Sequence, residues 1–584
     1  MTNGAIEEPV HQKSLRLWPG VAAIALQWLA WFGSAVVATG MTAAYIGVLG
    51  AFFCALIVVA WWLFFSRAPW PDRLLGVALM VVFMMVTPYF LHNSITGMGM
   101  GMMFYIFSIP FLCLALVVAA ALGRGLSAAP RRLVIVAAFV LVGMGWSVLR
   151  SDGIRGDGTS QFAFRWTDTP EERLLAQAGE RPSDFAAPPD TLEGPAQWPG
   201  FRGPKRDGIS RGVHIETDWT ASPPVELWRR QVGPGWSSFA VAGDVFYTQE
   251  QRGEHEVVAC YKTASGQPVW VHRDPTRFWE ANAGAGPRGT PTLAEGRVYT
   301  LGATGIVNAL EAADGSVVWS RNAAEDTGQE VPYWGFAGSP LVVEDIVIVA
   351  LAGQLAAYDR ESGMKRWVGP KGGAGYSSPH FSTIDGVAQV LLSRGAGVLS
   401  VAPQNGMLLW EHSWRGDGIV QPAVTAEGDV LLGSGSGVDG EVGMRRLAVA
   451  LDGGAWTVSE RWTSRGLKPY FNGFVVHRGH AFGFDGRILS CIDLEDGKRR
   501  WKGGRYGHGQ LVLLPDQDLL FVLSEDGDLA LVSATPDEFH EVGRVPAIEG
   551  KTWNHPVVVD DLVLVRNARE MAGFRISTKA AANH

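Results

Sequence analysis

The 584-residue sequence has little cysteine, and that cysteine follows no metal-binding spacing. Its four cysteines are Cys54, Cys113, Cys260 and Cys491, with no Cys-x-x-Cys-His segment and no zinc-ligand spacing. These absences argue against a c-type haem attachment and a cysteine-based zinc site. Cys260 and Cys491 hold one position of a repeat described below, where Ala or Ser stands in other copies, so we interpret them as small buried packing residues. Because their repeats are not neighbours, we expect no disulfide between them.

Charge is almost missing from residues 17–149, which are strongly apolar, whereas the chain after residue 150 is charged and rich in Gly and Trp. The split predicts a membrane part followed by a water-exposed part. The net charge of −8 gives no reason to expect a nucleic-acid partner.

Five apolar runs are long enough, or nearly so, to cross a bilayer. They are residues 17–38, 43–65, 74–91, 103–122 and 133–149. A cleaved signal peptide does not explain the first run, because four more follow. We therefore predict an all-α transmembrane bundle of five helices, in contact with the lipid bilayer.

Basic residues alternate between the two sides of these runs. Those on one side are Lys13, Arg16, Arg67, Arg73, Arg124, Arg131 and Arg132. The two other loops, around 39–42 and 92–102, carry no Lys or Arg. The positive-inside rule then places the N-terminus in the cytoplasm, and five crossings place the chain after Arg150 outside.

The runs carry no acidic or basic residue except at their ends, which argues against an ion or proton pump and favours a simple anchor. The methionines at 98, 100, 102 and 103 are soft ligands of the kind Cu(I) prefers. A flexible loop that enters a span explains this run better, and we predict no metal site.

A short motif recurs in the second part of the chain. In five copies a small residue lies six positions before a Gly, and a Trp lies four positions after that Gly. The Gly and Trp positions are Gly266 and Trp270, Gly315 and Trp319, Gly363 and Trp367, Gly406 and Trp410, and Gly497 and Trp501. Looser copies end at Trp228 and Trp462, and a last one without Trp ends near Val542. The intervals of 39 to 52 residues indicate a repeat architecture.

Each repeat is interpreted as one four-stranded blade. The Gly follows Asp, Ser or Asn in a turn that needs a positive φ angle, and a short strand carrying Trp comes next. One blade cannot bury its apolar faces alone, and a Trp that buries about 150–250 Å² can pin it to its neighbour. Four strands in about 40–50 residues is the spacing of a β-propeller.

The motif resembles the docking motif of the pyrroloquinoline-quinone (PQQ) type of propeller, Ala-x-Asp-x-x-x-Gly-x-x-x-Trp. The segment from Trp198 to Ser210 and the ending around 550–571 resemble a group of bacterial membrane or secreted PQQ-like repeat proteins. The resemblance implies an all-β propeller, a bacterial inner membrane and a periplasmic location for the propeller. Because folds host many functions, it does not by itself fix the chemistry.

We expect eight blades and four regions: an anchor at 1–149, a periplasmic linker with a short helix at 150–195, the propeller at 196–576 and a tail at 577–584. The helix is expected near 169–178, and the four prolines from 182 to 195 predict a semi-rigid spacer. The last half-blade needs an outer strand, which residues 222–230 can supply, so that no sheet edge stays open.

The segments that begin the first strand of each blade should ring the central channel. We predict a funnel that binds a small polar ligand or a periplasmic protein partner, formed by Trp236, Ser238, Arg288, Thr290, Trp334, Ser339, Tyr376, Ser378, Gln421, Asn472, His508, Gln510, Asn554 and His555. Trp553 lies near them. The alternative is that these residues only turn the chain and cap strands.

Two functions fit this pattern best, and a sensor or a sugar-binding module is a third alternative. Membrane glucose dehydrogenases of the PQQ class also join five spans to a periplasmic propeller, so the resemblance implies a dehydrogenase that oxidises an alcohol or sugar and passes electrons to a membrane quinone. That reaction needs Ca²⁺ held by oxygen ligands and an Asp base, and Asp417 is the single carboxylate near the funnel; Glu280, Glu330 and Glu549 lie further out. We therefore favour a binding or scaffolding propeller, as in compact eight-bladed relatives that bind protein partners.

Overall fold

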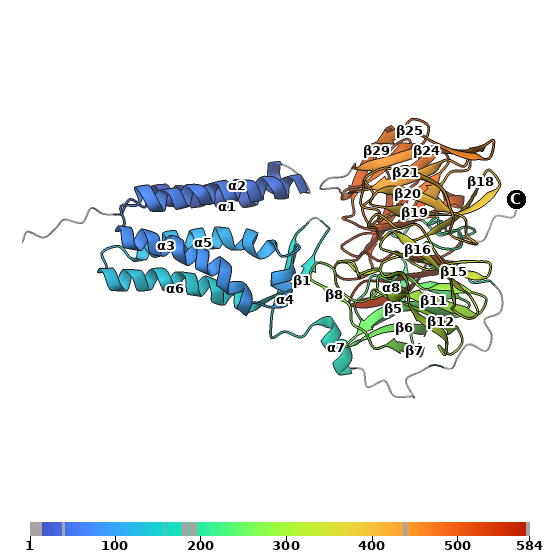
Figure 1. Cartoon of the computed structure of the whole chain (residues 1–584), viewed down its shortest axis with the longest axis horizontal. Coiled ribbons are helices and arrows are strands. Elements are labelled where there is room, and N and C mark those ends of the chain that lie inside the picture. Colours follow the sequence, from blue (N-terminus) through green and yellow to red (C-terminus); the bar gives the residue numbers. More distant parts are fainter. Residues whose placement is uncertain are drawn as a thin grey trace, which may run out of the picture. The chain divides into compact units, whose positions relative to one another are not determined.

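The computed structural model describes residues 15–37, 41–156, 158–177, 186, 195–435 and 441–579. It forms two compact units (Figure 1). The first holds residues up to 167 together with 281–283, and the second holds 168–280 and 284–584. Most of the predicted proline-rich spacer and the last five residues lie outside the described residues.

The first unit is helical. Its helices are α1 (Trp18–Val37), α2 (Met41–Ala60) with a π-helical continuation η1 (Trp61–Phe65), α3 (Trp70–Val86) with a 3₁₀ turn η2 (Thr87–Phe90), α4 (Asn93–Gly97), α5 (Met103–Leu122) and α6 (Ala128–Ser147). A hairpin of β1 (Leu149–Ile154) and β2 (Ser160–Phe164) follows. Helix α5 is the best buried, and its apolar residues join those of α2, α3 and α6 in one cluster.

Four helical stretches among the described residues are long and apolar enough to cross a membrane: Tyr45–Phe65, Trp70–Phe90, Met103–Leu122 and Ala128–Ser147. The sequence predicted five, so the count is corrected to four. The predicted first span, 17–38, is helix α1, which is not among the four and part of which lies outside the described side chains. Helices α3 and α6 begin earlier than predicted, at Trp70 and Ala128, and Asp72 near the start of α3 pairs with Arg131 and Arg132 near the start of α6.

The second unit begins with helix α7 (Pro170–Gln177), in the region where the short helix was expected. Its start is fixed by a reciprocal cap. The Thr169 hydroxyl accepts the Glu172 N–H at 3.0 Å, and the Glu172 carboxylate accepts the Thr169 N–H at 2.6 Å.

Eight four-stranded antiparallel sheets form the propeller, as predicted. Blades 1 to 4 are β4–β7 (Ala240–Ala242, Val245–Arg252, His255–Lys262, Pro268–Asp274), β10–β13 (Thr292–Ala294, Arg297–Leu301, Ile306–Glu311, Val317–Asn322), β14–β17 (Leu341–Val343, Ile346–Leu351, Gln354–Asp359, Lys365–Val368) and β18–β21 (His380–Ile384, Val387–Arg394, Gly397–Val401, Leu408–Ser413).

Blades 5 to 7 are β22–β25 (Ala423–Val424, Val430–Ser434, Gly443–Asp452, Ala455–Ser464), β26–β29 (Val475–His477, His480–Asp485, Ile488–Asp493, Arg499–Arg505) and β30–β33 (Gln510–Leu514, Leu519–Leu523, Asp528–Ser533, Glu541–Pro546). Short elements between blades are β8 (Trp279–Glu280), β9 (Gly284–Ala285) and α8 (Ala323–Thr327), and η4 (Pro515–Gln517) lies inside blade 7.

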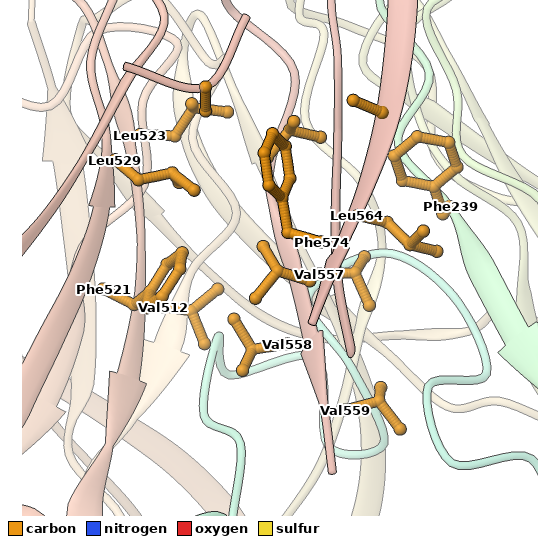
Figure 2. Packing of buried hydrophobic residues seen from close by; sticks show 14 of the residues in the cluster. Phe239, Val512, Phe521, Leu523, Leu529, Val557, Val558, Val559, Leu564 and Phe574 are labelled. Atoms are coloured by element: carbon orange, nitrogen blue, oxygen red, sulfur yellow. The ribbon is translucent and has the colours of Figure 1, made fainter. Parts of the chain in front are cut away.

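Blade 8 joins the two ends of the propeller. Strands β34 (Val557–Val559), β35 (Leu562–Arg566) and β36 (Glu570–Arg575) come from the end of the chain, and β3 (Val225–Gln231) supplies the outer strand. The expected role of residues 222–230 is thereby confirmed. The closure is well packed: Figure 2 shows Phe521 and Leu529 of blade 7 in one buried cluster with Val557 and Phe574 of blade 8.

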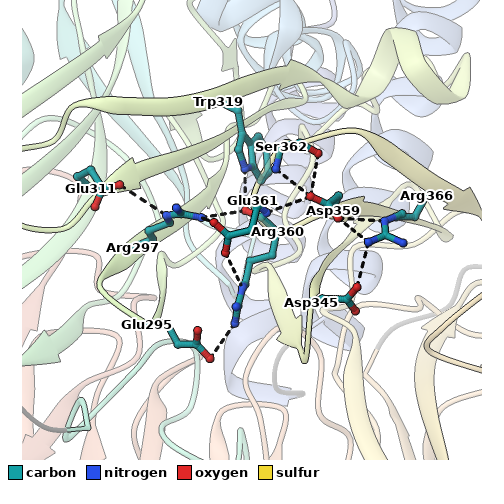
Figure 3. Close-up of polar contacts among 10 residues, drawn as sticks. All are labelled: Glu295, Arg297, Glu311, Trp319, Asp345, Asp359, Arg360, Glu361, Ser362 and Arg366. Carbon is teal, nitrogen blue, oxygen red and sulfur yellow. Dashed lines mark hydrogen bonds and ion pairs between the residues drawn. The ribbon is translucent and has the colours of Figure 1, made fainter.

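The repeated Gly and Trp meet across blade boundaries. The Trp319 indole occupies the place where a Cβ on Gly363 would lie, 2.6 Å from its nearest ring atom, and its Nε1–H donates to the Arg360 carbonyl at 2.9 Å. The same turn carries Arg360, which pairs with Glu295 of blade 2, and Figure 3 shows the surrounding ion pairs. Trp228, Trp270, Trp367, Trp462 and Trp501 each donate to a carbonyl of the following blade in the same way.

Candidate functional site

Four of the predicted funnel residues form a chain of hydrogen bonds from blade to blade. The N–H of Ser238 donates to the Thr290 hydroxyl at 3.0 Å, that of Thr290 to the Ser339 hydroxyl at 2.9 Å, and that of Ser339 to the Ser378 hydroxyl at 2.9 Å. All four residues are buried. The structure therefore brings them together, but their hydroxyls tie first strands to each other.

The amide positions of the ring are also used internally. Asn554 donates from Nδ2 to the Ser237 carbonyl at 2.7 Å, which joins blade 8 to blade 1. Gln510 donates to the Trp553 carbonyl at 2.9 Å, and Asn472 accepts the N–H of Tyr470 at 3.0 Å. Gln421 binds a segment discussed next. The alternative interpretation, in which these residues cap strands, thus describes most of the ring.

The segment Trp198–Ser210 runs across the inner strands, and we call it the plug segment. Its backbone and side chains bond to Val241, Leu293, Pro340, Gln421, Phe474, Leu513 and Val558, which belong to seven of the eight blades. Sequence reasoning identified this segment as a family resemblance and missed its place. A Trp before a run that is rich in Gly and Arg, directly upstream of the first blade, was the available signal.

Two plug arginines have the left-handed backbone conformation, with φ of 62° at Arg202 and 53° at Arg206. Arg206 donates to the carbonyls of Pro340 at 2.8 Å and Ser339 at 3.1 Å. Arg202 donates to the carbonyls of Asp207 at 3.0 Å and of Phe474. Burial lowers the pKa of Arg202 to about 10 and that of Arg206 to about 9, so both guanidinium groups stay charged at neutral pH.

Two histidines lie beside these arginines. Burial, and then the charges of Arg206 and Arg202, lower the pKa of His380 to about 3. Burial and Arg202 do the same for His555, whose ring packs edge-on against Phe201 of the plug segment with centroids 5.2 Å apart. Both imidazoles are therefore neutral at pH 7 and cannot act as cations in the channel.

A cluster of aromatic rings and one amine lies among the loops that lead into blades 1, 6, 7 and 8. Trp553 contacts Trp236 and Phe471, each with centroids 4.8 Å apart, and Phe471 stacks on His508 at 5.5 Å. The Lys551 Nζ lies 4.4 Å from the Trp553 ring centroid and 5.3 Å from that of Trp236. We call these five residues the mouth cluster. Burial lowers the pKa of Lys551 to about 8.

Two carboxylates lie near the mouth cluster. Glu525, which sequence analysis missed, accepts the Trp553 Nε1–H at 2.9 Å and the His508 N–H at 3.0 Å. Glu280 pairs with Arg288 at 3.2 Å, and both carboxylates raise the pKa of Lys551 against the effect of burial. Glu525 lies in the turn between the second and third strands of blade 7, and such turns lie at the same end of a blade as the start of its first strand.

The remaining predicted residues are more scattered. Trp334 and Tyr376 contact each other with centroids 5.3 Å apart. The Asp417 carboxylate accepts the Gly435 N–H at 3.1 Å and lies 3.4 Å from the Ser434 hydroxyl. It is thus held within the start of blade 5.

These residues do not fit the Ca²⁺ site that PQQ chemistry needs. No group of three or more His, Cys, Asp or Glu side chains in the described part of the chain is placed to hold a metal ion. The Asp417 carboxylate accepts the Gly435 N–H. Glu280 pairs with Arg288, and Glu525 accepts the Trp553 Nε1–H. We therefore derive no catalytic step through PQQ.

Comparisons with known proteins agree with the geometry of the blades. The sequence model of the family described as outer membrane protein assembly factor BamB matches residues 223–370 and 256–503. The outer membrane protein assembly factor BamB of Shewanella oneidensis is 25% identical over 337 residues, which cover 52% of this chain and 76% of that protein.

Solved structures give similar matches at lower identity. BamB from Moraxella catarrhalis is 14% identical with a TM-score of 0.45, covering 62% of this chain and 99% of that one. A europium-containing methanol dehydrogenase is 13% identical with a TM-score of 0.47, covering 66% and 99%. The quinohemoprotein alcohol dehydrogenase of Comamonas testosteroni is 14% identical with a TM-score of 0.48, covering 71% and 85%.

The family-model matches span β3 and blades 1 to 6, which include the turns in which each Gly receives a Trp from the blade before it. The chain therefore belongs to the PQQ-like β-propeller family.

Proposed function

We propose that the chain is a membrane-anchored propeller that binds a protein partner at its mouth cluster. The observation that carries the proposal is the contrast between two layers of the channel. The polar residues of the ring form hydrogen bonds between blades. The mouth cluster, in contrast, presents the partly exposed rings of Trp236, Phe471 and Trp553. Aromatic and cationic side chains of this kind dominate the binding energy of protein interfaces.

The anchor supports an orientation for the propeller. One end of the helical bundle carries the starts of α3 and α6 and the end of α5, where Arg131 and Arg132 bond to Asp72 and Arg124 donates to the Leu15 carbonyl. The positive-inside rule assigns this basic end to the cytoplasm.

Helix α6 runs from the basic end to the opposite end, where it finishes at Ser147. The propeller follows α6 in the chain and so starts on the non-cytoplasmic side. The orientation of α6 is the same whether or not α1 crosses the membrane. In a bacterium with two membranes, that side of the inner membrane is the periplasm, and the related BamB proteins are named for outer-membrane assembly.

A photo-crosslinking amino acid at position 236 in the full-length chain, expressed in its own membrane, tests the partner role. We expect one discrete adduct whose yield falls about tenfold when Trp553→Ala removes the central ring. The matched control is the same amino acid at Ser265, in the turn at the other end of blade 1, which should give no such adduct. Equal labelling at both positions would contradict the proposal.

The dehydrogenase alternative is tested on the same purified protein. Titration with PQQ and Ca²⁺, followed by dye reduction with alcohols and sugars, should give no turnover. Turnover that depends on both additives would overturn the binding role and would make Asp417→Asn the next variant.

A further inference from the structure

The plug segment places positive charge inside the propeller without matching negative charge. It carries Arg202, Lys205 and Arg206, and Arg211 follows directly, against a single acid, Asp207. Asp207 pairs with Arg211 at 2.7 Å. Arg206 is bonded to carbonyl oxygens and to the amide of Gln421, and Arg202 lowers its pKa further.

Elsewhere the protein supplies a carboxylate when it buries a guanidinium group. Arg252 pairs with Glu250 at 2.7 Å, and Glu250 also raises the pKa of Arg566. Arg394 pairs with Glu411 at 2.6 Å, and Arg445 with Glu441 at 2.9 Å. Arg206 departs from this rule, because burial and the charge of Arg202 both lower its pKa, whereas the charge of Asp207 raises the pKa of Arg202. An unpaired buried charge is costly, which favours a counter-ion at this place.

Two buried donors point to where that ion binds. Neither Arg202 Nε nor Asn472 Nδ2 has a hydrogen-bond partner among the described residues, and the two residues are 7% and 1% exposed. The two residues lie close together. A Cβ placed on Gly473, the residue after Asn472, would be 2.1 Å from Arg202 Nη1 and 3.6 Å from the His555 ring. Buried donors are normally satisfied, so a missing acceptor is expected here.

There is room next to the plug segment. A recess of about 310 Å³ is lined by Phe201, Arg206 and the turn residues of blades 2 and 3. Phe201, which lines the recess, also contacts the His555 ring. The two neighbouring imidazoles are neutral, and the recess itself is lined by Glu295, Glu344 and Arg360 besides Arg206.

We propose that the channel holds a small oxyanion, a phosphate, sulfate or carboxylate group, bound by Arg202 and Asn472 against the plug segment. The anion would add to the single negative charge of Asp207 beside Arg202 and Arg206, and it would accept hydrogen bonds from the two unpaired donors. The plug segment is then one wall of a binding site as well as a closure of the channel.

The test is equilibrium dialysis of the purified full-length chain with radiolabelled inorganic phosphate at constant ionic strength. We expect saturable binding of one phosphate per chain, and competition by sulfate or acetate shows which oxyanion is preferred. Arg202→Gln should weaken binding at least about tenfold. Lys205→Gln is the matched control, because it removes one positive charge from an exposed position of the same segment and should leave binding unchanged.

A second variant keeps the test decisive if Arg202→Gln does not fold. Asn472→Asp retains an oxygen for the Tyr470 N–H and adds the missing carboxylate beside Arg202. It should abolish phosphate binding and raise the thermal unfolding midpoint measured without phosphate. No saturable binding to the wild type, or equal binding to wild type and Asn472→Asp, would mean that water alone satisfies these donors and would overturn the proposal.

Discussion

At the scale of single residues, the contact between a docking Trp and the Gly of the next blade explains why these two residues recur together in five copies of the repeat. Gly315 has φ of 75°, and a Cβ on it would lie 2.4 Å from the Trp270 ring. Two separate requirements, a positive φ angle and an absent Cβ, therefore coincide at one residue. A second glycine of the same blade separates them.

Gly296 has φ of 77°, and no atom lies within 4 Å of the position of its Cβ. Gly296→Ala should thus lower the free energy of unfolding only by the cost of the left-handed backbone conformation, about 1–2 kcal/mol. Gly315→Ala should lose about 1–3 kcal/mol more, because the indole must shift. Thermal unfolding midpoints of the two variants measure the difference, and equal midpoints would mean that the Trp contact contributes nothing.

Glu256 gives the propeller a pH dependence. This carboxylic acid is buried, and burial, with a smaller contribution from Asp274, raises its pKa to about 8 although Arg288 and the Ala303 N–H oppose the shift. At pH values between the ordinary pKa of a glutamic acid and 8, Glu256 is protonated in the folded protein and ionised in the unfolded chain. Stability from this group is therefore present at low pH and is lost as the pH rises toward 8.

Glu256→Gln keeps the oxygen that accepts the Ala303 N–H and cannot ionise. We expect the variant to lose less stability than the wild type between pH 5 and 9, by up to about 1.4 kcal/mol per pH unit within the titration range. Unfolding midpoints at several pH values provide the measurement. The exposed Glu254→Gln should follow the wild type, and a parallel wild-type and Glu256→Gln profile would show that Glu256 is ionised in the folded state.

At the scale of elements, blade 5 shows how the fold adapts when the motif is broken. Its third and fourth strands, β24 and β25, are joined by a tight turn at 453–454 and lack the docking turn of the other blades. Trp410 of blade 4 consequently finds no carbonyl there and donates to Gln389 of its own blade at 2.7 Å. The sequence shows the missing Gly before Trp462, but the substitute partner depends on the register of β19 and cannot be predicted from spacing.

The candidate site likewise has a part that the sequence predicts and a part that it does not. Spacing predicts that Ser238, Thr290, Ser339 and Ser378 converge, since equivalent positions of a propeller share one ring. Whether such a residue bonds to its neighbour or to a ligand depends on distances of a few tenths of an ångström, which a single sequence does not encode. The plug segment was missed because its role rests on contacts with residues up to about 350 positions away, as between Ser210 and Val558.

At the scale of the whole molecule, the four cysteines make the membrane orientation directly measurable. All four are buried, so a maleimide that cannot cross membranes should label the wild-type protein weakly.

Ser127 lies between α5 and α6 at the basic end of the bundle, and Ser265 is exposed in a turn of blade 1. Under the proposed orientation, Ser265→Cys should be labelled when the non-cytoplasmic face of the membrane is accessible, and Ser127→Cys only after the membrane is permeabilised. The two variants control for each other, since each reports on the side that the other does not. The reverse pattern would place the propeller in the cytoplasm and refute the assignment of the Arg131 and Arg132 end to that side, whereas labelling of both in sealed cells would show that this bundle does not form a barrier between them.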